Sequence, residues 1–359
     1  MNHIKRIQEA LGDFSLEAIL ISSEVGGFYA LGMRNEGLIL LTPTQVHISV
    51  DGRYIEAVNA QIEREKIQNV TCHLIGGEVS HIGLAKEFIQ KNNLKEVAIE
   101  EGYLTLSTFR SYEEKLPCKL VNGGALLTAL RSVKTEEELG FLRTAQEITD
   151  KAFTEILNFI TPQRTEKDIS ARLAYEMAKL GGLSPSFSII VATGANGSRP
   201  HAVPGDRTID KGQFLTMDFG CLYKGYCSDM TRTICMGKPT EKMELVYNTV
   251  LEAQKAALAV AKAGMTGKEV DSVARSVIEK AGFGEKFSHG LGHGVGVEIH
   301  EEPNTNARNE KPLPVNAVCS IEPGIYLAGE FGVRIEDVIV LKEGGCEILT
   351  ASPKELILL

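Results

Sequence analysis

The chain of 359 residues has no tryptophan, and aromatic residues make up only 6% of it. No apolar run approaches the roughly 18 residues that a membrane-spanning helix needs, and residues 1–18 lack the apolar segment of a secretory signal. Positive charge is in deficit, with 38 Lys and Arg against 47 Asp and Glu, and no basic patch stands out. We therefore expect neither a membrane nor a nucleic acid as partner.

Disulfide signals are also missing. The seven cysteines are an odd number and include no CxxC pair. This pattern favours reduced thiols over a disulfide framework and predicts a cytoplasmic location. The overall composition, with 43% hydrophobic and 24% charged residues, is ordinary for a globular protein. The length favours about two domains.

Residues 1–125 are expected to form a small α/β domain. Helical spacing of apolar residues occurs in three segments, 3–11, 54–65 and 83–92. Short apolar runs predict strands at 18–21, 37–41, 46–50, 97–99 and 119–121. The isolated His47, His73 and His81 are interpreted as structural histidines. This domain could be a scaffold, or it could control substrate length or dimerisation.

Residues 126–134 are expected to link this domain to a second one, residues 135–359. The second domain contains a weak internal repeat, in which TEKDI at 165–169 resembles TGKEV at 266–270. Each copy has a threonine N-cap with an acid three residues later, follows a long amphipathic helix (135–160 or 240–263), and ends at a glycine. The repeat predicts two helix–helix–strand halves with pseudo-two-fold symmetry, which place helices outside a curved antiparallel sheet.

Five chemically suitable side chains lie in the strand and glycine-rich segments of this second domain. Asp218 and Asp229 flank a Gly-containing bend between two apolar strands, so a hairpin can bring their carboxylates together. Glu322 and Glu336 repeat this arrangement further along the chain, and His293 lies in the run GLGHGVG. A buried carboxylate is costly unless it is paired or binds a metal. Ordinary salt bridges would explain any one of these acids, but a shared metal site explains all five groups.

Four carboxylates and one imidazole favour Mn²⁺, Co²⁺ or Fe²⁺, and Zn²⁺ also accepts such ligands. Five ligands, two of them able to bridge, exceed what one ion needs. They fit two divalent ions roughly 3.5–4 Å apart that share a hydroxide, which is a hydrolytic arrangement. We therefore expect two divalent metal ions as cofactors, with Mn²⁺ preferred.

The pattern resembles the pita-bread metallopeptidases, a family that includes methionine aminopeptidase, aminopeptidase P and prolidase. The resemblance extends over the whole chain and is strongest at residues 199–236 and 289–338. It rests on RPH (199–201), DFG with SDMTRT, GHGVG with IHE, EPGIY and VRIED. It implies an α+β fold in which a pita-bread catalytic domain follows a smaller creatinase-like α/β domain. It also implies a homodimer.

Carried over by position, the resemblance makes five residues the metal ligands: Asp218, Asp229, His293, Glu322 and Glu336. It assigns catalytic roles to His201, His300 and Arg334, and a place in the substrate pocket to His289. His201 also counts as a substrate-binding candidate, and Tyr326 either lines the pocket or packs behind it. Glu322 is expected to accept the proton of the nucleophilic water and pass it to the leaving nitrogen. His201 and His300 are expected to stabilise the oxyanion or to position the peptide.

The motifs EPGIY and VRIED, together with the N-terminal domain, resemble those of the proline-specific members of this family. The expected substrate is thus a small peptide with proline in second position, whose Xaa-Pro bond has no N–H. Prolidases of this fold often place a carboxylate-binding arginine where this chain has Asn304, with Arg308 further on, so aminopeptidase P and Xaa-Pro dipeptidase both stay open. The alternatives are a methionine aminopeptidase-like enzyme, a hydrolase of non-peptide amides, and a non-catalytic peptide-binding scaffold on the same fold.

Overall fold

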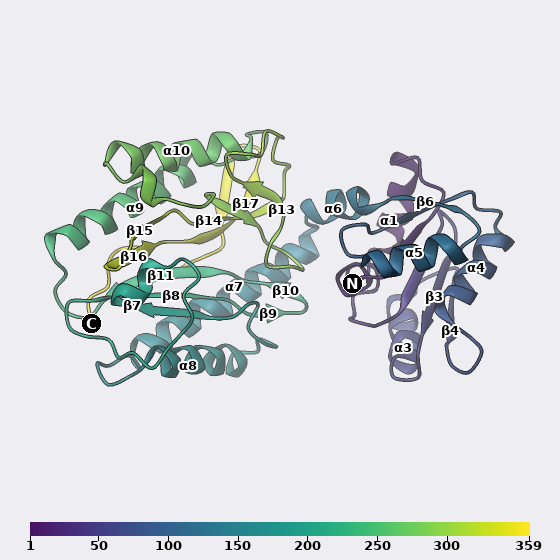
Figure 1. Ribbon diagram of the computed structural model, residues 1–359, viewed down its shortest axis with the longest axis horizontal. Helices are drawn as coiled ribbons and strands as arrows, with labels where there is room; N and C mark the ends of the chain where they lie inside the picture. The colour runs from purple at the N-terminus through teal and green to yellow at the C-terminus, as the bar shows by residue number, and fades with distance from the viewer. The chain divides into compact units, whose positions relative to one another are not determined.

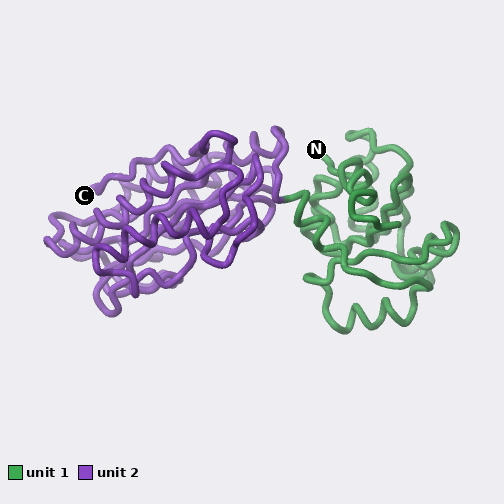
Figure 2. Tube along the Cα trace, turned by 90° about the horizontal axis from the view of Figure 1, so that it is seen from above, with its two compact units in different colours: residues 1–131 green, residues 132–359 purple.

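A computed structural model describes residues 1–359, which divide into two compact units, Met1–Arg131 and Ser132–Leu359 (Figure 2). The limits expected from the sequence, 1–125 and 135–359, lie inside these units. The segment expected as a linker is largely helical, because α6 spans Gly124–Ser132. No helix of the structure is both long and apolar enough to cross a membrane.

The first unit is built on one mixed sheet of six strands in the order β4-β3-β2-β1-β5-β6. The strands are β1 (Ile19–Ile21), β2 (Leu38–Leu41), β3 (Val46–Val50), β4 (Val70–Leu74), β5 (Glu96–Ile99) and β6 (Lys119–Asn122). The helices are α1 (Ile4–Asp13), α2 (Glu24–Leu31), α3 (Ile55–Glu65), α4 (His81–Lys91) and α5 (Leu106–Lys115). The predicted hairpin at 42–45 is confirmed, since β2 and β3 pair antiparallel across it.

The second unit contains four helices around antiparallel strands. The helices are α7 (Glu136–Leu157), α8 (Glu166–Lys179), α9 (Glu241–Val260) and α10 (Gly267–Lys280). The strands of its first half are β7 (Ile190–Thr193), β8 (Phe214–Phe219), β9 (Leu222–Tyr223), β10 (Tyr226–Cys227) and β11 (Met230–Cys235). Those of its second half are β12 (Gly292–Gly294), β13 (Glu301–Thr305), β14 (Val318–Ile321), β15 (Gly324–Leu327), β16 (Phe331–Arg334), β17 (Asp337–Lys342) and β18 (Gly345–Ile348).

Each half of the second unit has its own helix pair and core. Figure 1 shows α7 and α8 on one side of the strands and α9 and α10 on the other. Apolar residues of α7 and α8 pack against the sheet β11-β8-β7, and those of α9 and α10 pack against β14 to β17. Along β8, Leu215, Met217 and Phe219 belong to the first core. Because side chains alternate along a strand, Asp218 points away from that core, into the interior between the two halves.

The internal repeat predicted from the sequence appears as two matching helices. Thr165 caps α8 and Thr266 caps α10, each in a reciprocal capping box with the acid three residues on. After each helix comes a glycine in the left-handed conformation, Gly181 at φ 105° and Gly282 at φ 85°. Both helices contain 14 residues. The prediction of two related halves with helices outside antiparallel sheets is confirmed.

Candidate metal centre

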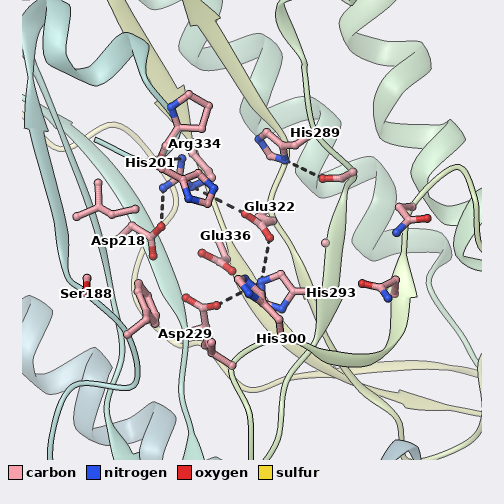
Figure 3. A pocket seen from close by; sticks show the side chains of 18 residues that line it. Ser188, His201, Asp218, Asp229, His289, His293, His300, Glu322, Arg334 and Glu336 are labelled. Atoms are coloured by element: carbon pink, nitrogen blue, oxygen red, sulfur yellow. Dashed lines mark hydrogen bonds and ion pairs between the residues drawn. The ribbon is translucent and has the colours of Figure 1, made fainter. Parts of the chain in front are cut away.

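Two hairpins and the short strand β12 bring the five predicted ligands to one pocket (Figure 3). Asp218 lies on β8, and Asp229 directly precedes β11, which pairs with β8 in register Thr231↔Asp218. Glu322 follows β14, and Glu336 lies between β16 and β17. His293 is the central residue of β12. The predicted acidic hairpins are thus present, and their carboxylates converge between the two halves.

Glycines around His293 allow β12 to sit closely against its neighbours. A Cβ at Gly292 would collide with the carbonyl group of Ser320, and one at Gly294 would collide with the backbone of Glu301 and Glu302. Only glycine fits positions where backbone approaches backbone so closely. The run of glycines therefore allows β12 to pack closely between β13 and β14, which places the His293 ring beside the carboxylates.

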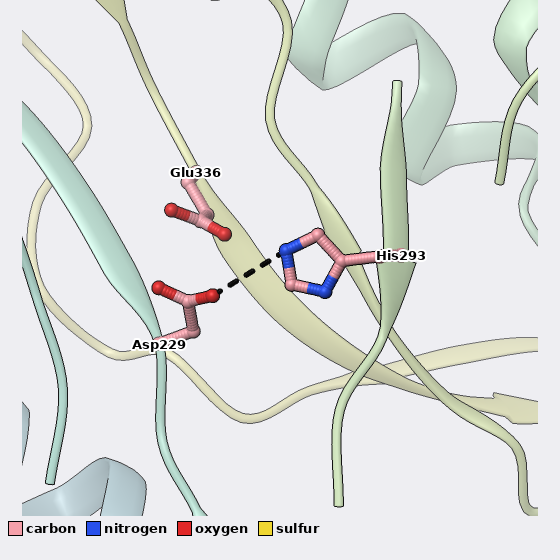
Figure 4. Close-up of side chains that lie close together, drawn as sticks. All are labelled: Asp229, His293 and Glu336. Atoms are coloured by element: carbon pink, nitrogen blue, oxygen red, sulfur yellow. Dashed lines mark ion pairs between the residues drawn. The ribbon is translucent and has the colours of Figure 1, made fainter. Parts of the chain in front are cut away.

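Three of the five side chains form a compact donor set. Asp229, His293 and Glu336 each offer a ligand atom, and these atoms lie within 4.8 Å of one another (Figure 4). One oxygen of Asp218, one of Asp229 and one of Glu336 is buried without a hydrogen-bond partner. Buried carboxylate oxygens without partners are rare in stable proteins. A divalent cation would satisfy them, so the residues present fit a metal ion.

The hydrogen bonds of His293 and Glu322 leave atoms free for a ligand role. His293 Nδ1 lies 3.1 Å from the Gly294 carbonyl oxygen. Since a carbonyl only accepts, Nδ1 carries a proton. Burial lowers the pKa of His293, but the hydrogen bond and charge of Glu322 raise it to about 9, so without metal the ring is also protonated at Nε2. A bound cation would replace that proton and take the lone pair of Nε2. That nitrogen lies 3.6 Å from Asp229 and 3.2 Å from Glu322. Ser320 Oγ donates to Glu322 at 3.1 Å and accepts from the His293 N–H at 3.0 Å, which holds the two residues together.

The charges of the centre indicate an excess of negative groups. Burial raises the pKa of Asp229 well above its usual value, and Glu336 and Asp218 raise it further. Burial likewise raises the pKa of Glu336, helped by Glu322 and Asp218. Burial alone would raise the pKa of Glu322, but the hydrogen bond and charge of His293 lower it to about 2. Such a cluster has to take up protons when no cation is bound, and bound metal would replace them.

A buried arginine supports one edge of the centre. Arg334, 3% exposed, donates to Asp218 at 2.5 Å and to the hydroxyl of Tyr326 at 2.9 Å. His289 Nδ1 faces the Gly290 carbonyl at 2.8 Å, so its Nε2 accepts from the Tyr326 hydroxyl at 2.9 Å. An Arg334–Tyr326–His289 chain of hydrogen bonds therefore joins the carboxylates to the far wall of the pocket.

The pocket has a volume of about 450 Å³ and contains nearly all the predicted site residues. His201 and His300 are exposed side chains on its wall, and the His300 ring meets the His293 ring edge-on with centroids 4.2 Å apart. Tyr326 is not among the lining residues; it is buried and packs behind Arg334 and His289. Pro200 and Ile299 line the pocket within the RPH and IHE motifs, whereas the sequence did not single out the lining residues Phe187, Ser188, Ile190 and Asn306.

Other residues from the sequence reading lie near the pocket or outside it. Asp337, next to the candidate ligand Glu336 in the chain, is fully buried, and Arg232 pairs with it at 2.8 Å. Asn304 lines the pocket, and its side-chain amide donates to Glu302 at 2.9 Å. Arg308 lies outside the pocket, in an adjoining hollow of about 430 Å³ that shares His289 with it. All seven cysteines are free thiols, as predicted.

The two-unit α+β fold and the convergent carboxylate–imidazole pocket define a protein of the metallopeptidase class. Residues 140–343 match the metallopeptidase family M24, and residues 3–133 match the creatinase/prolidase N-terminal domain. The chain belongs to the metallopeptidase family M24. This membership implies divalent metal ions at the centre, consistent with the unpartnered oxygens there.

Relatives from bacteria and archaea are similar over most or all of the chain. An uncharacterised peptidase of Bacillus subtilis is 36% identical over 99% of both chains, and an Xaa-Pro dipeptidase of Pyrococcus furiosus is 42% identical over 72% of this chain and 74% of its own. Among solved structures, an Xaa-Pro dipeptidase from Bacillus anthracis has a TM-score of 0.93 at 37% identity, covering 99% of both chains. An X-Pro aminopeptidase from Thermotoga maritima has a TM-score of 0.92 at 36% identity and full coverage of both. The predicted fold and family are confirmed.

Proposed function

We propose that this protein is a metal-dependent exopeptidase that hydrolyses the Xaa-Pro bond at the N-terminus of small peptides. The observation that carries the proposal is the convergence of four acidic side chains and one imidazole on a pocket of about 450 Å³. Relatives named Xaa-Pro dipeptidase and X-Pro aminopeptidase support the choice of bond. A pocket of this size suits a substrate of a few residues.

Five residues would hold the metal in this proposal: Asp218, Asp229, His293, Glu322 and Glu336. We propose two ions, because five ligands with carboxylates able to bridge exceed the needs of one, and Mn²⁺ because oxygen ligands predominate. When bound, the ions supply Lewis-acid activation of water and of the scissile carbonyl group. Burial raises the pKa of Asp218, and the Arg334 guanidinium, 2.5 Å away, opposes this rise and orients the carboxylate for its ligand role.

The remaining chemistry belongs to side chains of the pocket. Glu322 lies 3.2 Å from His293 Nε2 and accepts a hydrogen bond from Ser320 Oγ, so its carboxylate is held at the metal centre, where it can accept a proton. In the proposal it takes the proton of the attacking water and returns it to the proline nitrogen. His300 and His201 lie on the exposed wall, where they donate to the developing oxyanion or position the peptide. His289, hydrogen-bonded to Tyr326, lines the part of the pocket that would bind the substrate.

A preference for dipeptides over longer peptides depends on which residue binds the C-terminal carboxylate of an Xaa-Pro dipeptide. Asn304 lies in the pocket without positive charge, and Glu302 already engages its amide. A free dipeptide carboxylate therefore gains no ion pair at this position. We keep both substrates in the proposal, the Xaa-Pro dipeptide and the longer peptide with proline second.

The proposal includes a homodimer, on the family resemblance, and a cytoplasmic location, supported by the seven free thiols. Light scattering during gel filtration measures the first. The oligomer does not enter the argument for the reaction, which depends on residues of one chain.

The test uses Mn²⁺-loaded protein with three peptides, Ala-Pro, Ala-Pro-Ala and Met-Ala-Ser. Cleavage of Ala-Pro alone identifies an Xaa-Pro dipeptidase, and cleavage of Ala-Pro-Ala identifies an aminopeptidase P. Cleavage of Met-Ala-Ser alone would replace the proposal by a methionine aminopeptidase. No cleavage of any peptide, with metal stoichiometrically bound, would refute the peptidase proposal and favour a non-peptide amide.

A further inference from the structure

A buried ion pair lies beneath the segment that carries His300. Lys134 Nζ lies 2.8 Å from Glu301 Oε1, and the two side chains are 1% and 5% exposed. The partners are 167 residues apart in the chain. Lys134 directly precedes the N-cap of α7, and Glu301 opens β13, the residue after His300. The backbone N–H of Lys134 donates to the Asn316 carbonyl at 3.1 Å, which fixes the lysine at its base.

The Glu301 carboxylate fills the inside of the turn 295–300 that joins β12 to β13. It lies so close to Gly296 that a Cβ there would collide with it. The N–H of Glu298 approaches its other oxygen at 3.4 Å, and the Gly296 carbonyl accepts from the Cys227 N–H at 2.8 Å. The carboxylate thus contacts the turn from within, and Lys134 holds the carboxylate.

Stability alone does not explain such a pair. Removing two charges from water costs several kcal/mol for each ion, and apolar residues of similar volume often give equal or greater stability. An ion pair differs from an apolar contact in being directional, because the cation fixes where the carboxylate lies. Here the fixed carboxylate sits one residue from a side chain of the candidate site.

We propose that Lys134 is a positioning residue for His300. Through Glu301 it fixes the turn 295–300, so that the His300 imidazole stays edge-on to His293, with ring centroids 4.2 Å apart, on the wall of the pocket. The effect on turnover rests on the proposed function, whereas the position of the His300 ring does not.

The experiment compares Lys134→Met, Glu301→Leu and the double variant with the wild type, all loaded with Mn²⁺. Lys134→Met should lower both the melting temperature and kcat, because it removes the cation that lies 2.8 Å from a buried carboxylate. The double variant should recover a wild-type melting temperature, metal content and KM, while kcat for the cleaved Xaa-Pro peptide stays at least tenfold low. In its crystal structure the His300 ring should be displaced or disordered.

A matched control replaces an ion pair remote from the pocket, Arg172 with the fully buried Glu176 on α8. The double variant Arg172→Met with Glu176→Leu should leave kcat unchanged. A Lys134–Glu301 double variant with wild-type kcat and an unmoved His300 ring would overturn the proposal and leave the pair a purely structural role. If that variant does not fold, Lys134→Met with the isosteric Glu301→Gln gives the same comparison. If the wild type cleaves no Xaa-Pro peptide, the crystallographic position of His300 still decides the proposal.

Discussion

Replacement of Glu322 by glutamine tests the proposed proton acceptor while keeping its shape. The side chain accepts from Ser320 Oγ at 3.1 Å and faces His293 Nε2 at 3.2 Å, and it is 15% exposed. Glutamine retains an oxygen for the Ser320 hydroxyl but loses the negative charge and the basic site. The other four candidate ligands are untouched, so metal binding should be weakened rather than abolished.

The expected loss follows from the role assigned to this carboxylate. A positioned general base contributes about 10²–10⁴ in rate, which corresponds to roughly 3–5 kcal/mol at 1.36 kcal/mol for each factor of ten. We therefore expect kcat of Glu322→Gln to fall by about a thousandfold. At saturating Mn²⁺ the melting temperature should change little, because glutamine keeps the shape of the side chain and the hydrogen bond from Ser320.

The assay measures kcat for Ala-Pro or Ala-Pro-Ala at saturating Mn²⁺, with metal content determined on the same sample. Glu330→Gln is the control, because Glu330 is half exposed and pairs with Lys242 on the surface. Its kcat should equal that of the wild type. Near-full activity of Glu322→Gln with metal still bound would refute the assignment of Glu322 as proton acceptor.

Three further predictions address neighbouring features. Tyr326→Phe removes a hydroxyl that bonds Arg334 and His289, each at 2.9 Å, so kcat/KM should fall by about tenfold to a hundredfold; an unchanged value would show that the chain of hydrogen bonds is dispensable. Removal of metal should lower the melting temperature, and titration with Mn²⁺ should restore it progressively, because the ion binds only the folded centre; a melting temperature independent of Mn²⁺ would contradict the metal centre. Burial, with a smaller effect of His73, lowers the pKa of His47 from 6.5 to about 4. As the pH falls, the unfolded chain therefore takes up this proton first. The contribution of His47 to the stability of residues 1–131 is fully present above about pH 6.5 and falls by about 1.4 kcal/mol per pH unit between pH 6.5 and 4. His47→Gln should flatten this slope in hydrogen exchange of the β3 and β4 amides, and an unchanged slope would contradict the assignment.

The strands that carry the ligands could be predicted because their signals are local. Asp218 and Asp229 stand at the ends of apolar runs separated by a glycine-containing bend, and β8 and β11 pair there as expected. Capping boxes at Thr165 and Thr266 likewise marked the starts of α8 and α10 correctly. These features depend on residues close together in sequence, which pattern and spacing describe well.

Elements without such signals were not predicted. Helix α2 has the sequence EVGGFYAL, in which two glycines and a nearly all-apolar composition leave no helical periodicity. Strand β4 reads VTCHL, which mixes apolar and polar residues, and none of its side chains is fully buried. Phe187 and Ser188 reach the pocket from a segment outside helices and strands, so only the tertiary fold brings them there. The pairing of Lys134 with Glu301, 167 residues away, has no local signal either.

Anomalous diffraction at the manganese edge, from crystals of Mn²⁺-loaded protein, tests the metal centre most directly. The account predicts two strong peaks between Asp218, Asp229, His293, Glu322 and Glu336, with one of them inside the Asp229–His293–Glu336 set. Absence of peaks at this position, from protein that hydrolyses an Xaa-Pro peptide, would contradict the assignment of these five residues as the metal ligands of the enzyme.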